Sequence, residues 1–148
     1  PIPPGATEIH GIDDEMVRDA PTIDTLVDQI IPFLDGAVIV GHHVTFDVRF
    51  LNRVLLRVLH CRLPHPLVDT MLLYLSRTGR LGHHDLGEVA EACGVATRGR
   101  HDARGDAAIA AGILALLAGP AAEAGGSVRQ LIAGTRAGAP DAPTGPPG

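Results

Sequence analysis

The chain has 148 residues, of which 45% are hydrophobic and 3% aromatic, and its formal net charge is −5. This length predicts one domain with a modest core of small aliphatic side chains, and the acidic balance argues against a broad basic face that would hold nucleic acid by bulk electrostatics. No apolar run reaches the roughly 18 residues of a membrane span and no signal-peptide pattern is found, so we expect a cytoplasmic protein without a membrane partner.

Helical spacing of apolar residues and short buried runs divide the chain into alternating elements. Helices are predicted over residues 13–18, 22–34, 44–59, 69–77, 85–94 and 102–117. Short strands are predicted at residues 37–40 and 67–68. Strands that alternate with helices indicate an α/β layer architecture.

The C-terminal residues 119–148 have a different composition. Glycine and proline supply 12 of these 30 residues, seven and five respectively, which exceeds the roughly 25 to 30% at which low complexity becomes the expectation. We therefore expect a folded region over residues 1–118, followed by a disordered Gly/Ala/Pro-rich tail or linker without a catalytic role.

Two aspartates are predicted to lie on the apolar faces of helices. A step of about 100° per residue places Asp47 on one stripe with Phe50, Leu51, Val54, Leu55 and Val58. The same construction places Asp106 with Ile109, Ala110, Ile113 and Leu117, and no lysine or arginine lies on that stripe. A carboxylate held away from water is costly unless hydrogen bonds, an ion partner or a metal compensates. Two inward aspartates therefore suggest a shared cation.

Each aspartate also has a simpler interpretation, because an aspartate in the first turn of a helix stabilises the positive end of the helix dipole. His101, however, stands shortly before Asp106 in the run H-D-A-R-G-D-A. A group that titrates near neutrality beside a metal site is a candidate general base. The two aspartates together with this histidine favour a catalytic site over unrelated helix-start residues.

The runs around these aspartates resemble the motifs of a known family. G-H-H-V-T-F-D at 41–47 is similar to the second motif of the DEDDh 3′-to-5′ exonucleases, and H-D-A-R-G-D-A at 101–107 is similar to their third. The family includes the proofreading subunits of bacterial replicative polymerases, oligoribonuclease and RNase T. Further similar segments lie at 8–17, 66–71 and 83–90. The resemblance therefore covers most of the region before the tail.

The resemblance implies a ribonuclease H-like fold with a mixed central sheet. It also implies hydrolysis of phosphodiester bonds from the 3′ end of single-stranded DNA or RNA, with two Mg²⁺ or Mn²⁺ ions. Asp47 and Asp106 would be metal ligands, and His101 would take a proton from the attacking water. The residues expected to contact the substrate are Phe46, His42 and His43.

The sequence departs from the family in two places. His43 stands where the family has asparagine, and an imidazole does not reproduce the paired donor and acceptor of an amide. The family's D-x-E motif lies on a first strand upstream of the I-H-G-I segment, and residues 1–7 contain no such strand or motif. Asp13-Asp14-Glu15 does read D-x-E, but we expect it to be a surface helix start.

From this absence we expect a fold truncated at its N-terminus, without the first strands of the sheet and with an incomplete two-ion site. Activity of the chain alone is then not assured. The gene product is expected to be longer at its N-terminus, or else a partner strand or a second copy completes the sheet. A DNA polymerase or a further domain of a longer chain is another expected partner.

Two alternatives stay open. His84-Asp85 and His101-Asp102 are H-D pairs, as in HD-type metal phosphohydrolases that act on nucleotides, although that fold is all-helical and carries the pair inside a helix. The second alternative is a non-catalytic remnant or interaction module, in which Asp47 and Asp106 would only start helices. A shift in thermal stability on adding manganese would favour a real metal site.

Overall fold

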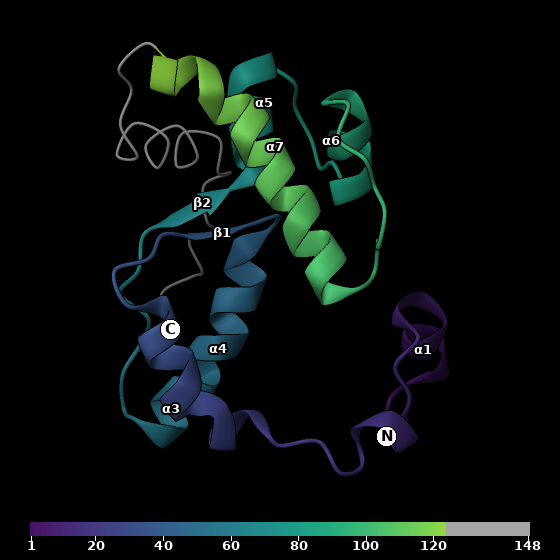
Figure 1. The fold of residues 1–148 in the computed structure, drawn as a ribbon, viewed down its shortest axis with the longest axis vertical. Helices are drawn as coiled ribbons and strands as arrows, with labels where there is room; N and C mark the ends of the chain where they lie inside the picture. Colours follow the sequence, from purple (N-terminus) through teal and green to yellow (C-terminus); the bar gives the residue numbers. More distant parts are fainter. Residues whose placement is uncertain (124–148) are drawn as a thin grey trace, which may run out of the picture.

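Helices dominate residues 1–123, the part of the chain that the computed structural model describes (Figure 1). The helices are α1 (Pro4–His10), α2 (Asp14–Val17), α3 (Ile23–Leu34), α4 (Val44–Val58), α5 (Thr70–Thr78), α6 (Leu86–Ala92) and α7 (Ala103–Glu123). The strands are β1 (Ile39–Gly41) and β2 (Leu67–Asp69). The predicted order of helices and strands is confirmed, whereas α1 was not predicted.

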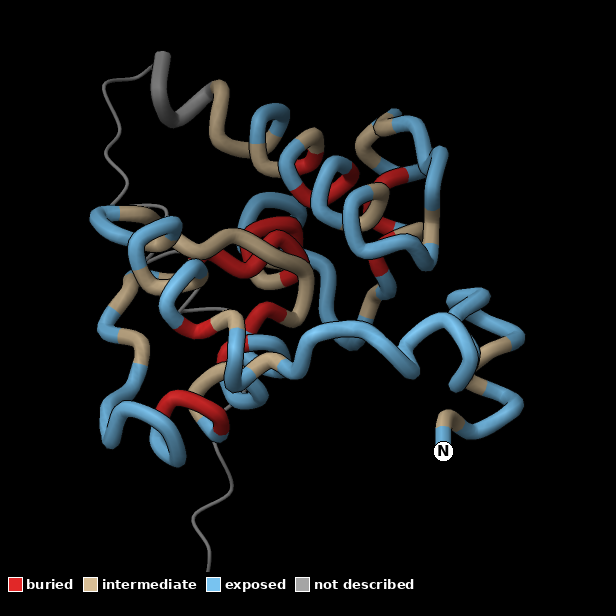
Figure 2. Tube along the Cα trace, turned by 60° about the horizontal axis from the view of Figure 1, so that its bottom comes forward, coloured by how far each residue is buried: buried red, intermediate tan, exposed pale blue. Residues whose placement is uncertain are grey.

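The N-terminal helices lie away from the core. α1 begins with a proline in its first turn and ends at Gly11, whose left-handed φ of 73° suits glycine. Asp13 caps α2 by accepting a hydrogen bond from the Met16 backbone N at 2.9 Å. None of residues 1–22 is buried, and Figure 2 shows this segment extending from the body of the fold. The predicted surface helix start at the D-x-E run is therefore confirmed.

β1 and β2 form a parallel pair with Val40 opposite Val68. Both α4 and α7 contact β1, so this strand links the two helices that carry the candidate aspartates. Within residues 1–123 the sheet consists of these two strands. The mixed central sheet that the resemblance implied is thus not formed by these residues, and the α/β architecture is present in a helix-rich form.

The main core lies where α5, α6 and α7 pack against one another (Figure 1). The buried side chains of this first cluster are Tyr74, Leu86, Val89, Ala90, Ile109, Ala110 and Ile113. Three of them come from the predicted apolar face of α7, which is therefore confirmed. α7 runs to Glu123, beyond its predicted end at Leu117.

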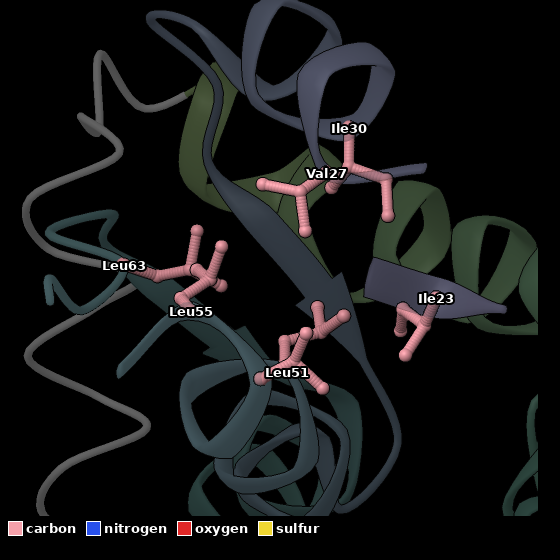
Figure 3. Close-up of a pocket in the computed structure, with 7 residues that line it drawn as sticks. Ile23, Val27, Ile30, Leu51, Leu55 and Leu63 are labelled. Atoms are coloured by element: carbon pink, nitrogen blue, oxygen red, sulfur yellow. The ribbon is translucent and has the colours of Figure 1, made fainter. Parts of the chain in front are cut away.

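A second, smaller cluster lies between α3 and α4. Its buried residues are Val27, Val54 and Leu55, with Ile23, Ile31 and Leu63 packed against them. A cavity of about 10 Å³ remains between the two helices, and Figure 3 shows its aliphatic lining. The residues around the cavity are Ile23, Val27, Ile30, Leu51, Val54, Leu55 and Leu63. A small aliphatic void therefore remains within this cluster.

No helix within residues 1–123 combines the length and the apolar character needed to cross a membrane. The predicted disordered tail falls mainly on residues 124–148, which lie outside the described part of the chain. Its first residues, up to Glu123, belong to α7. The division of the chain at residue 118 stays a prediction.

Candidate active site

Among residues 1–123, Asp69 is the most fully buried aspartate, with an exposed fraction of 5%. It ends β2, and its carboxylate accepts hydrogen bonds from the backbone N of Met71 at 3.0 Å and of Leu72 at 3.4 Å at the start of α5. It also accepts from the backbone N of His43 at 3.2 Å and of Val44 at 3.1 Å at the start of α4. One carboxylate therefore fixes the N-termini of both helices.

The predicted helix over residues 69–77 begins at this aspartate, but its contact with α4 was not predicted. An aspartate between a strand and a helix signals an N-cap, whereas nothing in the local pattern indicates a second helix start across the sheet. The contact depends on the parallel pairing of Gly41 with Asp69, which brings the ends of the two strands together. The start of the helix that carries Asp47 is thus held by the neighbouring strand.

His42 forms a bridge within the protein. Its Nδ1 lies 3.0 Å from Thr70 Oγ1, and its Nε2 lies 2.9 Å from the backbone O of His84. Burial lowers the pKa of His42 below its usual value, and the hydrogen bond to His84 opposes this effect in part. Both ring nitrogens are engaged internally, which favours a positioning function over direct contact with substrate.

His43 precedes α4 in the left-handed conformation, with a φ of 56°. Its ring stacks on that of His83 at a centroid distance of 4.5 Å. Its Nε2 is buried and has no hydrogen-bond partner among residues 1–123. His43 replaces the family's asparagine, and in the described part of the chain its ring leaves one nitrogen without a hydrogen bond.

Asp47 does not point inward as predicted, because it is exposed. The buried residues of α4 are Val44, Val48, Val54 and Leu55. Val54 lies seven residues after Asp47, on the predicted stripe, and packs in the cluster with Val27. The predicted stripe is therefore covered at Val54 but not at Asp47 or Phe50, of which Phe50 is 54% exposed.

Phe46 is 76% exposed and adjoins Asp47 in the first turn of α4. An aromatic ring at such a position is free to stack on a base. The prediction that Phe46 contacts a terminal nucleotide stays a prediction.

Asp106 lies in the first turn of α7 with its side chain 35% exposed. Its Oδ1 accepts hydrogen bonds from Arg100 Nη1 at 3.1 Å and from the His101 backbone N at 3.3 Å. The apolar stripe of α7 contains no cation, as the sequence indicated, but the preceding turn supplies one. Asp106 therefore has a basic partner that comes from outside its own stripe.

His101 is exposed and occupies the turn before α7 with a left-handed φ of 69°. The turn is tightly packed, since a Cβ on Gly105 would come within 1.9 Å of the Gly99 backbone O. Glycine at position 105 therefore allows this close backbone approach. The imidazole thus stands at the surface, on a closely packed turn whose backbone N at His101 contacts Asp106.

The described residues do not fit a two-ion metal site. Within residues 1–123, no three His, Cys, Asp or Glu side chains converge closely enough to hold a metal ion. Asp106 is already engaged by Arg100, and Asp47 faces solvent. These residues offer single carboxylates, and a Mg²⁺ site built from protein groups needs several oxygen ligands in octahedral geometry.

The protein belongs to the RNase T exonuclease family, because the family's exonuclease model matches residues 1–114. It is 36% identical to the DNA polymerase III subunit epsilon-like protein of Rhodobacter capsulatus, over 72% of the chain and 15% of that protein. It is 33% identical to DNA polymerase III subunit epsilon of Treponema pallidum, over 73% of the chain and 51% of that protein.

A third relative is the 3′-5′ exonuclease DinG of Staphylococcus saprophyticus, which is 28% identical over 76% of the chain and 13% of its own length. The chain thus spans between 13% and 51% of these three relatives. The predicted family is confirmed, and an exonuclease-like function is supported at the level of the family. The function of each site residue stays a prediction.

The HD phosphohydrolase alternative loses its structural basis. His84-Asp85 precedes α6, and His101-Asp102 lies in the turn before α7, so neither pair is inside a helix as that fold requires. Asp85 instead forms a capping box with Glu88 at the start of α6. The parallel strands and the family match both favour the exonuclease interpretation.

Proposed function

We propose that this chain carries the Asp47 and Asp106 motifs of a metal-dependent 3′-5′ exonuclease. Its substrate would be the 3′ end of single-stranded DNA or RNA, and its reaction phosphodiester hydrolysis. The main support is the family match over residues 1–114, which includes both motifs. Further support comes from the fold, because both aspartates lie in the first turns of helices that contact β1.

In this proposal Asp47 and Asp106 would each supply one carboxylate to Mg²⁺ or Mn²⁺, and the ions would stabilise charge on the phosphate. The remaining acidic ligands would come from outside residues 1–123. His101 accepts the proton of the attacking water, since a neutral imidazole is a good base near pH 7. Its exposed position beside Asp106 leaves the ring accessible to solvent and substrate.

The relatives suggest the setting of the reaction. Two of them are named as DNA polymerase III subunits or similar proteins, and one as an exonuclease. We propose that the chain acts beside a DNA polymerase or within a longer polypeptide. β1 pairs on one side with β2 among the described residues, so a strand from a partner or a second copy is proposed to extend the sheet at its other edge.

The test is 3′ shortening of 5′-labelled single-stranded DNA and RNA, with Mg²⁺ or Mn²⁺, by the natural polypeptide that contains these residues. Asp47→Asn and Asp106→Asn should each reduce the rate by at least about 100-fold, and His101→Ala by about 10²- to 10⁴-fold. Asp102→Asn is the matched control, because Asp102 is exposed, lies in the same turn and keeps a capping oxygen. Full activity of both Asp47→Asn and Asp106→Asn would refute the proposal.

A non-catalytic interaction module is the second candidate, and the ion pair between Asp106 and Arg100 favours it. In such a module the carboxylate would only secure the start of α7. Asp106→Asn would then lower stability while the natural polypeptide kept any hydrolytic activity it has. Loss of hydrolysis in a variant that melts like the wild type would exclude this candidate.

A further inference from the structure

Four exposed side chains form a strip along the outer side of α4. Phe46 and Phe50 are 76% and 54% exposed, and Arg49 and Arg53 are exposed as well. With a step of about 100° per residue, the four side chains fall within a sector of about 100°. The buried residues of the helix lie on its other side, where α4 contacts α3 and the two strands (Figure 1). We call Phe46, Arg49, Phe50 and Arg53 the Phe/Arg strip.

The Phe/Arg strip concentrates positive charge in an acidic chain. The formal net charge of the chain is −5, whereas α4 contains three arginines and a single acidic residue, Asp47. Arg57 is paired with Asp24, but Arg49 and Arg53 form no ion pair within residues 1–123. In the described part of the chain, two guanidinium groups of the strip are therefore available to an anionic ligand.

Aromatic and basic side chains alternate along the strip. The two phenylalanines are four residues apart, as are the two arginines, and this separation corresponds to a rise of about 6 Å along the helix. The whole strip is about 10 Å long, which matches about three stacked nucleotides at about 3.4 Å each. An aromatic ring stacks on an unpaired base, and an arginine binds phosphate oxygens. The strip thus offers partners for both the bases and the backbone of a single strand.

The strip begins beside the proposed site. Phe46 adjoins Asp47 in the first turn of α4, and Arg53 lies about two turns further along the helix. A strand whose 3′ end reaches Asp47 can therefore continue over the three later residues of the strip.

We propose that the Phe/Arg strip binds the two nucleotides next to the terminal one on a single-stranded nucleic acid. Phe50 stacks on a base, and Arg49 and Arg53 contact phosphates. The proposal rests on the proposed function, because that function places the 3′ end of the strand at Asp47. Binding at the strip itself needs no metal ion, since its side chains supply stacking and positive charge.

The chemistry of the strip favours a single strand over other occupants. The base faces of a duplex are stacked on one another, so they are not accessible to Phe50. A protein partner would have to supply a carboxylate for each of Arg49 and Arg53 as it buried them. A single strand instead carries a phosphate at every nucleotide and an accessible face on every base.

Stacking is tested by the fluorescence anisotropy of a 5′-labelled oligothymidylate, in EDTA, with the natural polypeptide that contains these residues. Phe50→Ala should weaken binding by about 5- to 150-fold, which is the loss of one stacked base. Phe33→Ala is the matched control, because Phe33 is 85% exposed but lies on α3. The control should bind like the wild type. Thermal melts establish that each variant is folded before affinities are compared.

The phosphate contacts are tested by the salt dependence of the same binding. The slope of log affinity against log salt should become less steep by about 0.7 for each of Arg49→Gln and Arg53→Gln, and by about 1.4 for the double variant. A purely structural effect would lower the affinity without changing this slope. Arg77→Gln is the control, because Arg77 is exposed on α5 and forms no ion pair among the described residues.

The length of the substrate separates this proposal from the proposed function. A dinucleotide bound with its 3′ end at Asp47 does not extend as far as Arg53. Arg53→Gln should therefore lower kcat/KM for a long single strand and leave kcat/KM for a dinucleotide unchanged. An equal loss on both substrates would contradict a contact beyond the terminal nucleotides.

Wild-type affinity and salt slope in both Phe50→Ala and Arg49→Gln/Arg53→Gln would overturn the proposal while leaving the exonuclease function intact. Equal losses in the Phe33→Ala and Arg77→Gln controls would also overturn it, because binding would then not depend on the strip. Unchanged oligonucleotide affinity together with an altered sedimentation coefficient would assign the strip to a protein interface instead. The exonuclease function fails separately, if Asp47→Asn and Asp106→Asn both retain full hydrolysis.

Discussion

The packing around α7 and the packing around α4 differ in completeness. α7 buries its apolar face against α5 and α6, and Ile113 at the centre of that cluster is inaccessible to solvent. α4 buries one stripe against α3 and the strands but leaves Phe46 and Phe50 exposed. The apolar stripe of an amphipathic helix predicts the buried face reliably where the described chain supplies every partner for that face. Where partners are lacking, the apolar stripe alone does not fix the orientation.

The largest expected effect comes from removing a side chain of the first cluster. Ile113→Ala should lower the free energy of unfolding by about 2 to 5 kcal/mol, because it removes a fully buried side chain and leaves a cavity. Phe50→Ala, on the open side of α4, should change it by no more than about 0.5 kcal/mol. Urea unfolding followed by circular dichroism measures both. Similar losses for the two variants would contradict the difference in packing.

Asp69 joins the two regions, so its removal should affect both. Asp69→Asn keeps one acceptor but loses the charge that four backbone N–H groups share, and should cost about 1 to 3 kcal/mol of unfolding free energy. Asp28→Asn, at an exposed position of α3, is the control and should be nearly neutral. Hydrogen exchange should show faster opening at the first turns of both α4 and α5. Acceleration at α5 alone would mean that the bond to α4 contributes little.

The sequence was informative where local chemistry determines the outcome. The helix cap at Asp69, the close approach at Gly105 and the apolar stripe of α7 follow from neighbouring residues. The orientation of Asp47 was wrong, because long-range contacts cover its stripe at Val54 and leave Asp47 and Phe50 exposed. The partner of Asp106 was missed for a similar reason, since Arg100 comes from a turn that has no periodic pattern.

A fall in pH should lower the stability of the protein through protonation of His42. Its pKa in the folded protein lies below the usual 6.5, chiefly because of burial, so the unfolded chain binds its proton more readily. The corresponding stability is fully present above pH 6.5 and is lost as the pH falls through the lower, folded-state pKa.

The measurement is urea unfolding at a series of pH values for the wild type and His42→Asn, in which this contribution should vanish. His60→Asn is the control, because His60 is exposed and its left-handed backbone suits asparagine. If the pH dependence of His42→Asn matched that of the wild type, another group would be responsible for it.

The smallest expected effect concerns how well each of the two regions tolerates added side-chain volume. Val54→Ile adds a methyl group beside the small aliphatic cavity between α3 and α4, which can accommodate part of the added volume (Figure 3). It should change the free energy of unfolding by less than about 0.5 kcal/mol, whereas Ala90→Val in the closed cluster should cost about 1 to 3 kcal/mol through overpacking. Denaturant midpoints at matched slopes give the comparison. An equal cost at both positions would show that α3 and α4 are packed as rigidly as α5, α6 and α7, and that the exposed stripe of α4 does not reflect a looser region of the fold.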